Sequence, residues 1–362
     1  MKIALITNIP APYRIPVYNK IAKELDNNFT VFYCAKIESN RKWSIGELRH
    51  NHIFLKERVF QYKDRYIYFN PEIWKRLKNY DPSVVITVGF NPTVLLGWLY
   101  AVIYRKKHIP MSDGWLKSEA NLSKLHFFIR KIVYKYSDAF IGVSKHTLSM
   151  FEHYGIPKEK IFQSQLCVDN KRFRQFISTQ KTYDVMFSGQ FIESKMPFFF
   201  LEIVKKLKEY KRDLKILLIG SGSLEDKILR ELNQSKINYD FPGFVQQENL
   251  PKYYASSKLL LFPTRSDSWG IVANEACAVA TPVITCDNAG AANDLIIDGV
   301  TGFVLPLNSD LWVEKTLELL NDKNLYNKIS RTAIEKVQEY NFDVATEGFI
   351  KACEKSLEAK CQ

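Results

Sequence analysis

Long apolar runs, repeats and low-complexity tracts are all missing from this 362-residue sequence. No apolar run reaches the ~18–20 residues that a membrane-spanning helix needs. The opening MKIALITNIPAPYRIP has no small-residue cleavage site, so we expect a first β-strand and a loop rather than a signal peptide. A content of 46% hydrophobic and 25% charged residues is ordinary for a soluble globular protein, which excludes a largely disordered chain.

Cysteine and metal-binding patterns are equally sparse. The six cysteines show no CxxC or other metal-ligand spacing, which favours reduced thiols in a cytoplasmic protein. Neither an Asp-x-Asp motif nor a cluster of His, Asp and Glu with metal spacing occurs, so we predict no metal ligands. The cysteines are Cys34, Cys167, Cys277, Cys286, Cys353 and Cys361.

Acidic residues are scarce in the first half of the chain. Residues 1–180 hold 29 Lys and Arg against 14 Asp and Glu, whereas the remainder holds 22 against 25. The net charge of +12 therefore lies in a cationic first half that is also rich in aromatic residues. Such asymmetry predicts an anionic surface or substrate for that half, and charge alone does not choose between nucleic acid and acidic phospholipid.

Short β-branched runs alternate with helix-length amphipathic stretches along the whole chain, which is typical of parallel α/β architecture. The length suits two domains, and the polar stretch Ser178–Thr182 is the best linker candidate. A last amphipathic helix, from about residue 343 to 362, fits either half. Strands are predicted at 2–7, 29–34, 83–89, near 109–111, 139–144, 183–189, 214–222, 239–245, 258–264, 282–286 and 302–306.

Ligands of open α/β sheets bind beyond the carboxyl ends of the strands, so the residues after each strand carry the functional predictions. LIGSGSLEDKI resembles a phosphate loop, but Glu225 replaces the third glycine, and a tight strand–helix turn is favoured over a dinucleotide site. In FSGQFIESKMP, Lys195 precedes a helix that begins with Pro197. Lys195 is well placed to neutralise a phosphate beside free helical N–H groups, or is simply a solvated loop residue.

The segment FPTRSDSWGIVANEACAVATPVI carries two acids, Asp267 and Glu275, around a Trp-Gly pair that opens a helix. Gly270 lets the backbone approach a ligand, and the N–H groups of Gly270, Ile271 and Val272 form an anion site. Asp267 can accept hydrogen bonds from hydroxyls, and Glu275 can hold a vicinal diol such as ribose. Alternatively, Asp267 caps the helix and Glu275 complements its dipole.

The stretches IGVSKHTLSMFEHYGIPKEKIFQSQLCVDNKRF, FSGQFIESK, FPTRSDSWGIVANEACAVATPVIT and NAGAANDLIIDGVTGFVLP occur in this order. Together they resemble a retaining glycosyltransferase of glycosyltransferase family four, with the α/β GT-B fold. The resemblance implies two Rossmann-like domains whose parallel sheets face each other across a cleft. Residues 1–177 would form the acceptor-binding domain and residues 178–342 the nucleotide-sugar-binding domain.

The resemblance also implies roles for individual residues. Lys195, Asp267 and Glu275 would act as catalytic groups on the diphosphate, the donor sugar and the ribose. The residues that would hold the donor are Gly189, Gln190, Val245, Arg265, Trp269, Gly270, Ile271, Val272 and Glu275. The sequence departs from the family at Asp267, where a glutamate is usual, and at Gln190, where an arginine is usual. Arg265 or Arg14 is a candidate for the missing positive charge.

In the first half, PMSDGWLKS follows a strand, so Asp113 is a candidate to orient the acceptor or to act as a base, or else caps a turn. Arg14, Asp113 and Gly114 are the candidate acceptor residues. The stretch SKLHFFIRKIVYKYSDAF places Phe128, Ile132 and Tyr136 on one helix face with basic residues around it. This pattern fits either a surface for anionic lipid headgroups or a helix with a solvated basic side.

The sequence therefore predicts a retaining, metal-independent glycosyltransferase. The donor would be a UDP or GDP sugar, with no other cofactor, and the acceptor a lipid-linked or surface glycan in bacterial polysaccharide biosynthesis. We expect it in the cytoplasm or peripherally at the inner face of the cell membrane, without nucleic acid. The alternatives are a nucleotide-sugar epimerase of the same fold and a non-enzymatic protein that binds polyanions or membranes.

Overall fold

Two units, each built on a parallel β-sheet, make up the fold. The computed structural model describes residues 1–62, 65–120 and 122–358. The first unit joins Met1–Leu166 to the C-terminal segment from Phe342 onward, and the second unit is Cys167–Asn341. Residues 359–362, the end of the predicted last helix together with Cys361, lie outside the described residues.

The first unit contains a seven-stranded sheet in which every neighbouring pair is parallel. Hydrophobic residues fill both faces of its central strands, as expected for a sheet covered by helices. The strands in sheet order are β3 (Asn51–Phe54), β2 (Phe29–Tyr33), β1 (Ile3–Thr7), β6 (Val84–Val88), β7 (Lys107–Ser112), β8 (Phe140–Gly142) and β9 (Ile161–Gln163).

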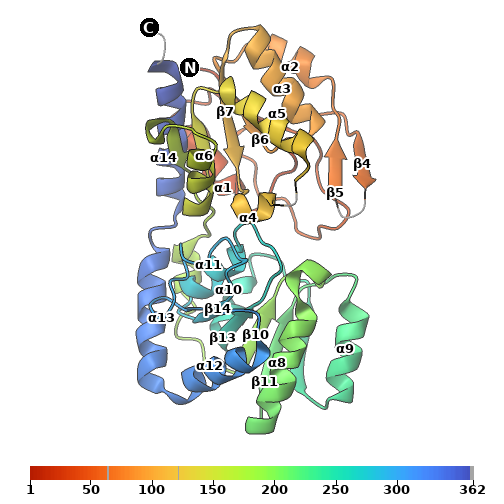
Figure 1. Ribbon diagram of the computed structural model, residues 1–362, viewed down its shortest axis with the longest axis vertical. Helices are drawn as coiled ribbons and strands as arrows, with labels where there is room; N and C mark the ends of the chain where they lie inside the picture. Colours follow the sequence, from red (N-terminus) through yellow and green to blue (C-terminus); the bar gives the residue numbers. More distant parts are fainter. Residues whose placement is uncertain (63–64, 121, 359–362) are drawn as a thin grey trace. The chain divides into compact units, whose positions relative to one another are not determined.

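Helices cover both faces of this sheet, and a hairpin of β4 (Val59–Tyr62) and β5 (Arg65–Tyr68) lies beside it (Figure 1). On one face, Ile6 and Phe32 pack with Leu77 and Tyr100 of two helices. On the other face, Phe29 contacts Phe349 of the C-terminal helix at a ring distance of 5.7 Å. The helices are α1 (Ile15–Glu24), α2 (Ile73–Tyr80), α3 (Pro92–Ile103), α4 (Leu116–Glu119), α5 (Lys124–Lys135), α6 (Lys145–His153), the 3₁₀ turn η1 (Lys158–Lys160) and α14 (Phe342–Glu358).

The second unit contains a six-stranded parallel sheet. Its strands in sheet order are β12 (Asn238–Gly243), β11 (Lys215–Ile219), β10 (Tyr183–Ser188), β13 (Ser257–Phe262), β14 (Val283–Thr285) and β15 (Phe303–Val304). Figure 1 shows α8 and α9 on one side of this sheet and α10, α11 and α13 on the other. The helical segments are α7 (Asn170–Arg174), η2 (Glu193–Lys195), α8 (Pro197–Tyr210), α9 (Glu225–Gln234), α10 (Leu250–Ala255), α11 (Ile271–Ala278), α12 (Ser309–Asn321) and α13 (Lys323–Val337).

The boundary between the two units differs from the sequence-based expectation. The units divide between Leu166 and Cys167, before the predicted boundary at residues 177 and 178, and α7 belongs to the second unit. The side chain of Asn170 explains this, because it donates to the backbone oxygens of Val337 and Tyr340 at 2.9 and 3.0 Å. Residues 290–301, which follow β14, form turns and isolated bridges. Within the described chain, no helix has the length and apolar character needed to cross a membrane.

Candidate active site

Lys195 and Asp267 come together at the carboxyl ends of two neighbouring strands, β10 and β13. The Lys195 ammonium lies 2.5 Å from the Asp267 carboxylate, and both side chains keep part of their surface exposed. The two loops are also joined through the Ser194 carbonyl, which accepts from the Arg265 N–H at 2.9 Å and the Thr264 hydroxyl at 3.0 Å. The site therefore holds a lysine next to the loop that leads into α11.

The N-terminal end of α11 begins after a glycine with positive φ. Gly270, the residue before the helix, has φ +98°, and a β-carbon there would lie 2.3 Å from the Phe262 ring. Within the described chain, no side chain caps this helix, and its first turn carries no acid. Ile271 and Val272, both half-buried, therefore begin a helix whose positive dipole end has no built-in negative partner.

Asp267 does not cap α11, so that alternative for its role is wrong. Its Oδ1 accepts from the Trp269 N–H at 3.1 Å, which forms a local turn before the helix. The indole of Trp269 is buried, donates from Nε1 to Asn274 Oδ1 at 2.7 Å and packs on Tyr340. Trp269 therefore shapes the loop from the inside, and its backbone N–H is already used by Asp267.

Glu275 lies one turn into α11 and is 5% exposed. Burial raises the pKa of this carboxyl to about 7, partly offset by the Tyr254 hydroxyl and the charge of Arg172. The Tyr254 hydroxyl lies 2.6 Å from Glu275 Oε2 and 2.8 Å from the Ser188 hydroxyl, and burial holds the pKa of Tyr254 well above its usual range. Among the described residues Glu275 Oε1 makes no hydrogen bond, so it is the oxygen that can accept from a ligand.

Arg172 is a site residue that the sequence analysis did not single out. Its Nη2 donates to the Gln247 carbonyl at 2.5 Å, and its positive charge lowers the pKa of Glu275. Its buried Nε has no hydrogen-bond partner among the described residues. The signal was its position three residues after Asp169, in a stretch quoted for the family resemblance, but nothing local in the sequence links it to Glu275.

The other predicted donor residues occupy the same edge of the sheet. Gly189 follows β10 and donates its N–H to the Ile219 carbonyl at 3.0 Å, and Gln190 beside it is half-buried and engaged in the fold. Val245 is half-buried in the loop after β12. Arg265 is exposed, with its guanidinium 3.9 Å from the Glu193 carboxylate, so it remains accessible to a phosphate.

The glycines of LIGSGS have a packing role. A β-carbon on Gly220 would lie 1.8 Å from the Gly189 carbonyl oxygen, and one on Gly222 would lie 2.4 Å from the Phe191 carbonyl oxygen. The Phe191 N–H donates to the Ser221 carbonyl at 2.9 Å. The tight-turn interpretation of this motif is therefore confirmed, and the glycines hold the loop that leads to Lys195.

The candidate acceptor residues belong to the first unit. Arg14 and Asp113 line one pocket of about 230 Å³ at the carboxyl ends of β1, β6 and β7. Gly114 follows Asp113, and its N–H donates to the Ser112 hydroxyl at 3.0 Å. Asp113 has interactions of its own within the structure.

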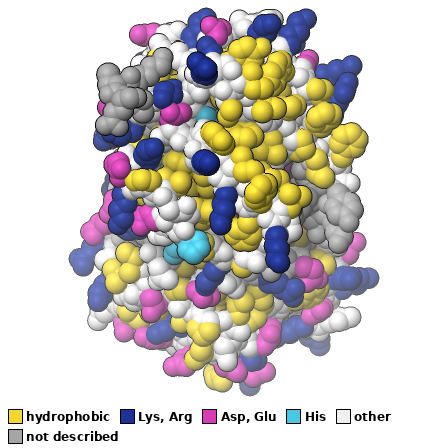
Figure 2. All heavy atoms as spheres, turned by 45° about the horizontal axis from the view of Figure 1, so that its top comes forward, with side chains coloured by type: hydrophobic (Ala, Val, Ile, Leu, Met, Phe, Trp, Pro, Cys, Tyr) yellow, Lys and Arg dark blue, Asp and Glu magenta, His cyan; other side chains and the backbone are white. Residues whose placement is uncertain are grey.

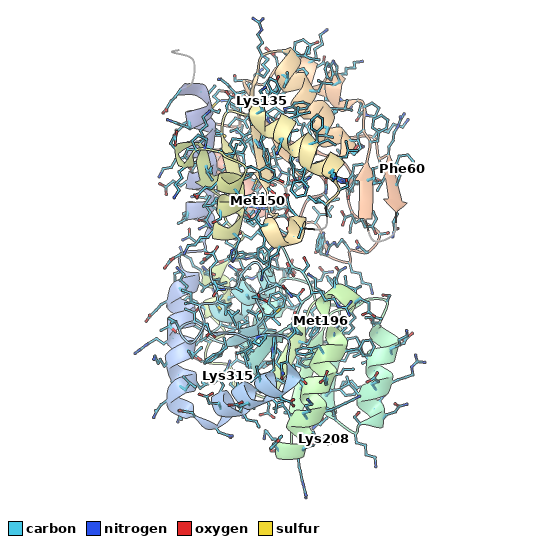
Figure 3. The ribbon with its side chains drawn as sticks, viewed as in Figure 1. Phe60, Lys135, Met150, Met196, Lys208 and Lys315 are labelled. Atoms are coloured by element: carbon cyan, nitrogen blue, oxygen red, sulfur yellow. The ribbon has the colours of Figure 1, made fainter. Side chains whose placement is uncertain are left out.

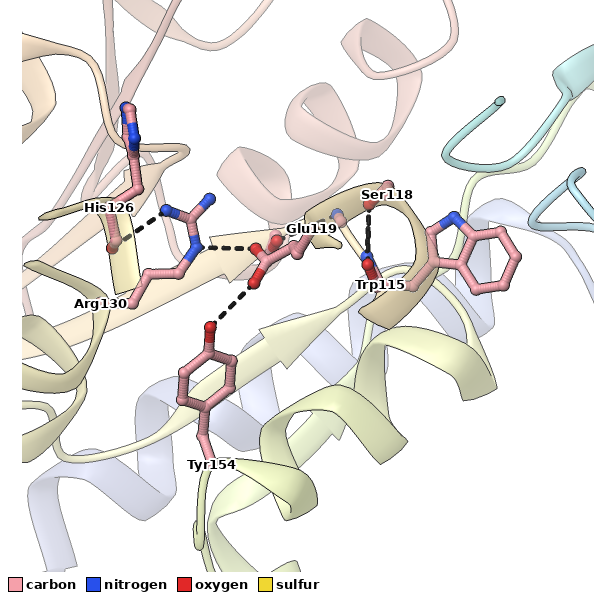
Figure 4. A network of polar contacts seen from close by, with 8 residues as sticks. Trp115, Ser118, Glu119, His126, Arg130 and Tyr154 are labelled. Carbon is pink, nitrogen blue, oxygen red and sulfur yellow. Dashed lines mark hydrogen bonds and ion pairs between the residues drawn. The ribbon is translucent and has the colours of Figure 1, made fainter. Parts of the chain in front are cut away.

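A buried polar network holds the segment after Asp113 in place (Figure 4). The Glu119 carboxylate accepts from Arg130 Nε at 2.7 Å and from the Tyr154 hydroxyl at 3.0 Å, which joins α4, α5 and α6. Arg130 is therefore a structural residue and not part of the basic rim predicted for α5. Among the described residues, no group of three or more His, Cys, Asp and Glu is arranged to hold a metal ion.

Comparisons with known proteins agree with this arrangement. Residues 169–336 match the family model described as "Glycosyl transferases group 1", and residues 21–172 match "Glycosyltransferase Family 4". The fold is that of Anabaena HepE solved with UDP, which superposes with a TM-score of 0.77 at 14% identity and covers 98% of this chain and 100% of that one. The chain belongs to the glycosyltransferases that combine these two domains, and its fold is GT-B.

Two relatives show how far the sequence similarity extends. A Campylobacter jejuni enzyme that adds α-1,4-N-acetylgalactosamine to an undecaprenol-diphosphate-linked glycan is 24% identical over 74% of this chain and 73% of its own length. A Klebsiella pneumoniae protein from a cps region is 24% identical over 56% of each chain. The chain thus matches a little over half of the length of the Klebsiella relative.

Proposed function

We propose that the protein is a retaining glycosyltransferase that moves a sugar from a UDP or GDP sugar to a hydroxyl acceptor. The observation that carries the proposal is the grouping of Lys195, Asp267, Glu275 and the uncapped start of α11 at one edge of the second sheet. A nucleoside diphosphate needs positive charge for its phosphates and a hydroxyl acceptor for its ribose. Lys195 with the helix start meets the first need, and Glu275 Oε1 meets the second.

Glycosyl transfer passes through an oxocarbenium-like state, during which the departing diphosphate gains negative charge. When the donor binds, Lys195 separates from Asp267. Lys195 and the N–H groups at the start of α11 then stabilise this charge. Asp267 is then available to accept hydrogen bonds from the donor sugar's hydroxyls. The acceptor hydroxyl attacks C1 of the sugar from the face that the diphosphate leaves, and its proton passes to the departing phosphate oxygen as the C1–oxygen bond to the diphosphate breaks. Retention therefore needs no enzyme nucleophile, and the positive charge of the site replaces that of a metal.

Site variants test this proposal. We expect Lys195→Ala and Glu275→Ala each to lower turnover about 100-fold or more, because each removes an interaction with the donor. Lys205→Ala, whose exposed ammonium pairs with Glu231 on the protein surface, is the matched control and should retain its rate. The assay measures acceptor-dependent nucleotide release from a panel of UDP and GDP sugars in EDTA. Epimer formation without acceptor, or normal rates in both site variants, would refute the proposal.

The acceptor we propose is a lipid-linked or surface glycan in bacterial polysaccharide biosynthesis. The Campylobacter relative, whose acceptor is linked to undecaprenol diphosphate, supports this class of acceptor. A second support is the exposed surface formed by α3 and α5, which is both apolar and basic. Its exposed residues are Leu99, Ile103, Tyr104, Arg105, Lys124, Leu125, Phe128, Lys131, Lys135 and Tyr136.

This α3–α5 surface has the composition of a peripheral membrane site. Phe128 is 60% exposed and Leu125 64%, although large apolar side chains normally lie inside. Val133 and Tyr134 hold the opposite side of α5 in the core, and among the described residues none covers the exposed face. Figure 2 turns the end of the first unit toward the viewer and shows hydrophobic side chains beside Lys and Arg. Figure 3 labels Lys135 at the end of α5. We propose that this surface holds the enzyme at the anionic inner face of the cell membrane.

A further inference from the structure

Arg14 is a buried cation in the pocket of the first unit. The residue is 9% exposed, and its Nη1 donates to the Ser164 carbonyl at 3.2 Å. Among the described residues no carboxylate lies within ion-pair distance of it. A buried guanidinium without an acid partner is rare, because removing a charge from water is costly unless an opposite charge compensates it.

The position of Arg14 adds to this cost. It is the residue directly before α1, at the N-cap position of a helix whose first turn contains no acid and whose start has no side-chain cap. The N-terminal end of a helix carries partial positive charge, and cations are normally found at the opposite end. Two sources of positive potential thus converge on one pocket at the carboxyl ends of β1, β6 and β7.

The other charged residues of the pocket do not neutralise Arg14. Arg41 also lines the pocket, but its Nε lies 3.3 Å from Glu38, and its guanidinium stacks on Trp43 at 4.8 Å. The Tyr68 hydroxyl donates to the same Glu38 carboxylate at 2.5 Å. Asp113 lines the pocket beyond ion-pair distance of Arg14, so the two can bind different groups of one ligand.

We propose that this pocket binds an anionic group on the acceptor, a carboxylate of an acidic sugar or a phosphate, through Arg14. The inference rests on the proposed function and names a chemical class for the acceptor. A pocket of about 230 Å³ is smaller than the roughly 300–1,000 Å³ of sites that enclose drug-sized ligands, so it receives one sugar ring or one headgroup. Arg14 pairs with the anion, and Asp113 accepts a hydrogen bond from a hydroxyl of the same ring.

The first test uses the full-length wild-type chain. Ligand-observed NMR titrations, with excess UDP present to occupy the proposed donor site, compare methyl β-glucuronide with methyl β-glucoside, which carries a hydroxymethyl group in place of the carboxylate. Inorganic phosphate serves as a second anion. We expect the glucuronide, the phosphate or both to bind about tenfold or more tightly than the glucoside. Equal, weak binding of all three would overturn the proposal. A preference for glucuronide or for phosphate tells which anion the acceptor carries.

Variants test whether Arg14 binds the anion, and whether that anion belongs to the acceptor or to the donor. Arg14→Gln should abolish the preference for the anion, Arg14→Lys should keep part of it, and Arg212→Gln, an exposed arginine of the second unit, should leave it intact. UDP affinity should change less than about threefold in all three variants, since Arg14 is assigned to the acceptor. A tenfold loss of UDP affinity in Arg14→Gln would instead assign Arg14 to the donor diphosphate and overturn the inference.

The same titrations separate this inference from the proposed function. UDP binding by the wild type without any anion preference would refute the anionic acceptor alone. Anion preference without UDP binding would refute the donor site and leave the Arg14 pocket standing. Thermal unfolding of each variant, monitored by circular dichroism, confirms that a lost preference does not come from a lost fold.

Discussion

Burial of the Glu275 carboxyl lowers the stability of the fold above neutral pH, where the group is ionised. Its burial beside Tyr254 raises its pKa from 4.5 to about 7. A carboxyl whose pKa is higher in the folded state than in the unfolded state binds extra protons on folding. Its contribution to stability is therefore complete below pH 4.5 and is lost as the pH rises through 7. An apolar residue could fill this buried position without such a cost. A carboxyl kept there is therefore typical of a functional site.

This argument predicts a pH-dependent effect of Glu275→Gln. The free energy of unfolding of the wild type should fall, relative to that of the variant, by about 3 kcal/mol between pH 4.5 and pH 8. Urea unfolding at both pH values measures it, with Glu248→Gln, at an exposed carboxyl, as the control. An equal difference between wild type and Glu275→Gln at both pH values would show that Glu275 is not held neutral by burial.

Spacing within one segment identified Asp267 and Glu275 from the sequence, because both follow the same strand. It did not identify Tyr254 or Arg172, which reach Glu275 from α10 and α7. Nor did it show that Arg14 is buried without an acid, or that Arg130 pairs with Glu119. These properties depend on contacts between residues far apart in the chain, which no local pattern specifies.

At the scale of elements, the loop that carries Lys195 depends on the turn after β11. Gly220 has φ +141°, and its α-carbon faces the Gly189 carbonyl so closely that no side chain fits. Because the Gly189 N–H is bonded to Ile219, the loop is fixed from both sides. Figure 3 labels Met196, which follows Lys195 and leads into α8.

Gly220→Ala should therefore destabilise the second unit by about 3 kcal/mol or more, through backbone strain and overpacking together. Gly299→Ala is the matched control, since Gly299 also has positive φ, +68°, but no atom lies within 4 Å of its added β-carbon. The control should cost about 1 kcal/mol. Urea unfolding compares the two variants, and equal losses would mean that the contact with Gly189 is not limiting.

The predicted strands of both units are confirmed, because β-branched runs that alternate with amphipathic helices are a strong and specific signal of parallel sheets covered by helices. The edge strands β3 and β9 and the hairpin of β4 and β5 were missed. NHIF is half polar and IFQ spans only three residues, so neither stands out in the sequence. β3 and β9 form strands because they pair with β2 and β8, and not because of their own composition.

At the scale of the whole molecule, the chain returns to its first unit through α14. A β-carbon on Gly348 would lie 1.8 Å from the Gln163 carbonyl oxygen of β9, and Phe349 packs on Phe29 of β2. The sequence left the position of this helix open, since its amphipathic pattern fits either half. The first unit therefore needs residues from both ends of the chain.

Gly348→Ala should loosen α14 from the first unit. We expect amides of β9 and α14 to exchange with deuterium about tenfold or more faster, while those of the second unit stay unchanged. Glu347→Ala, at an exposed position beside it that pairs with Lys351, is the control. Unchanged protection in Gly348→Ala would show that the close approach of Gly348 to Gln163 is not required.

The membrane association that we propose also concerns the whole molecule. The chain should bind vesicles that contain anionic lipid and bind neutral vesicles weakly. Replacing Phe128 by Ala with Lys131 and Lys135 by Gln should lower that binding about tenfold or more, since each basic residue near such a surface contributes about 1 kcal/mol. Tyr210→Ala with Lys227→Gln, on the second unit, is the matched control. Sedimentation with vesicles measures both, and equal loss in the two variants would exclude the α3–α5 surface.

A crystal structure of the chain with bound UDP or GDP tests the central claim most directly. The account predicts the diphosphate at the start of α11 with the Lys195 ammonium turned from Asp267 to a phosphate oxygen, and a ribose hydroxyl bonded to Glu275 Oε1. Nucleotide bound away from this edge of the second sheet, or Lys195 still paired with Asp267 in the complex, would contradict it.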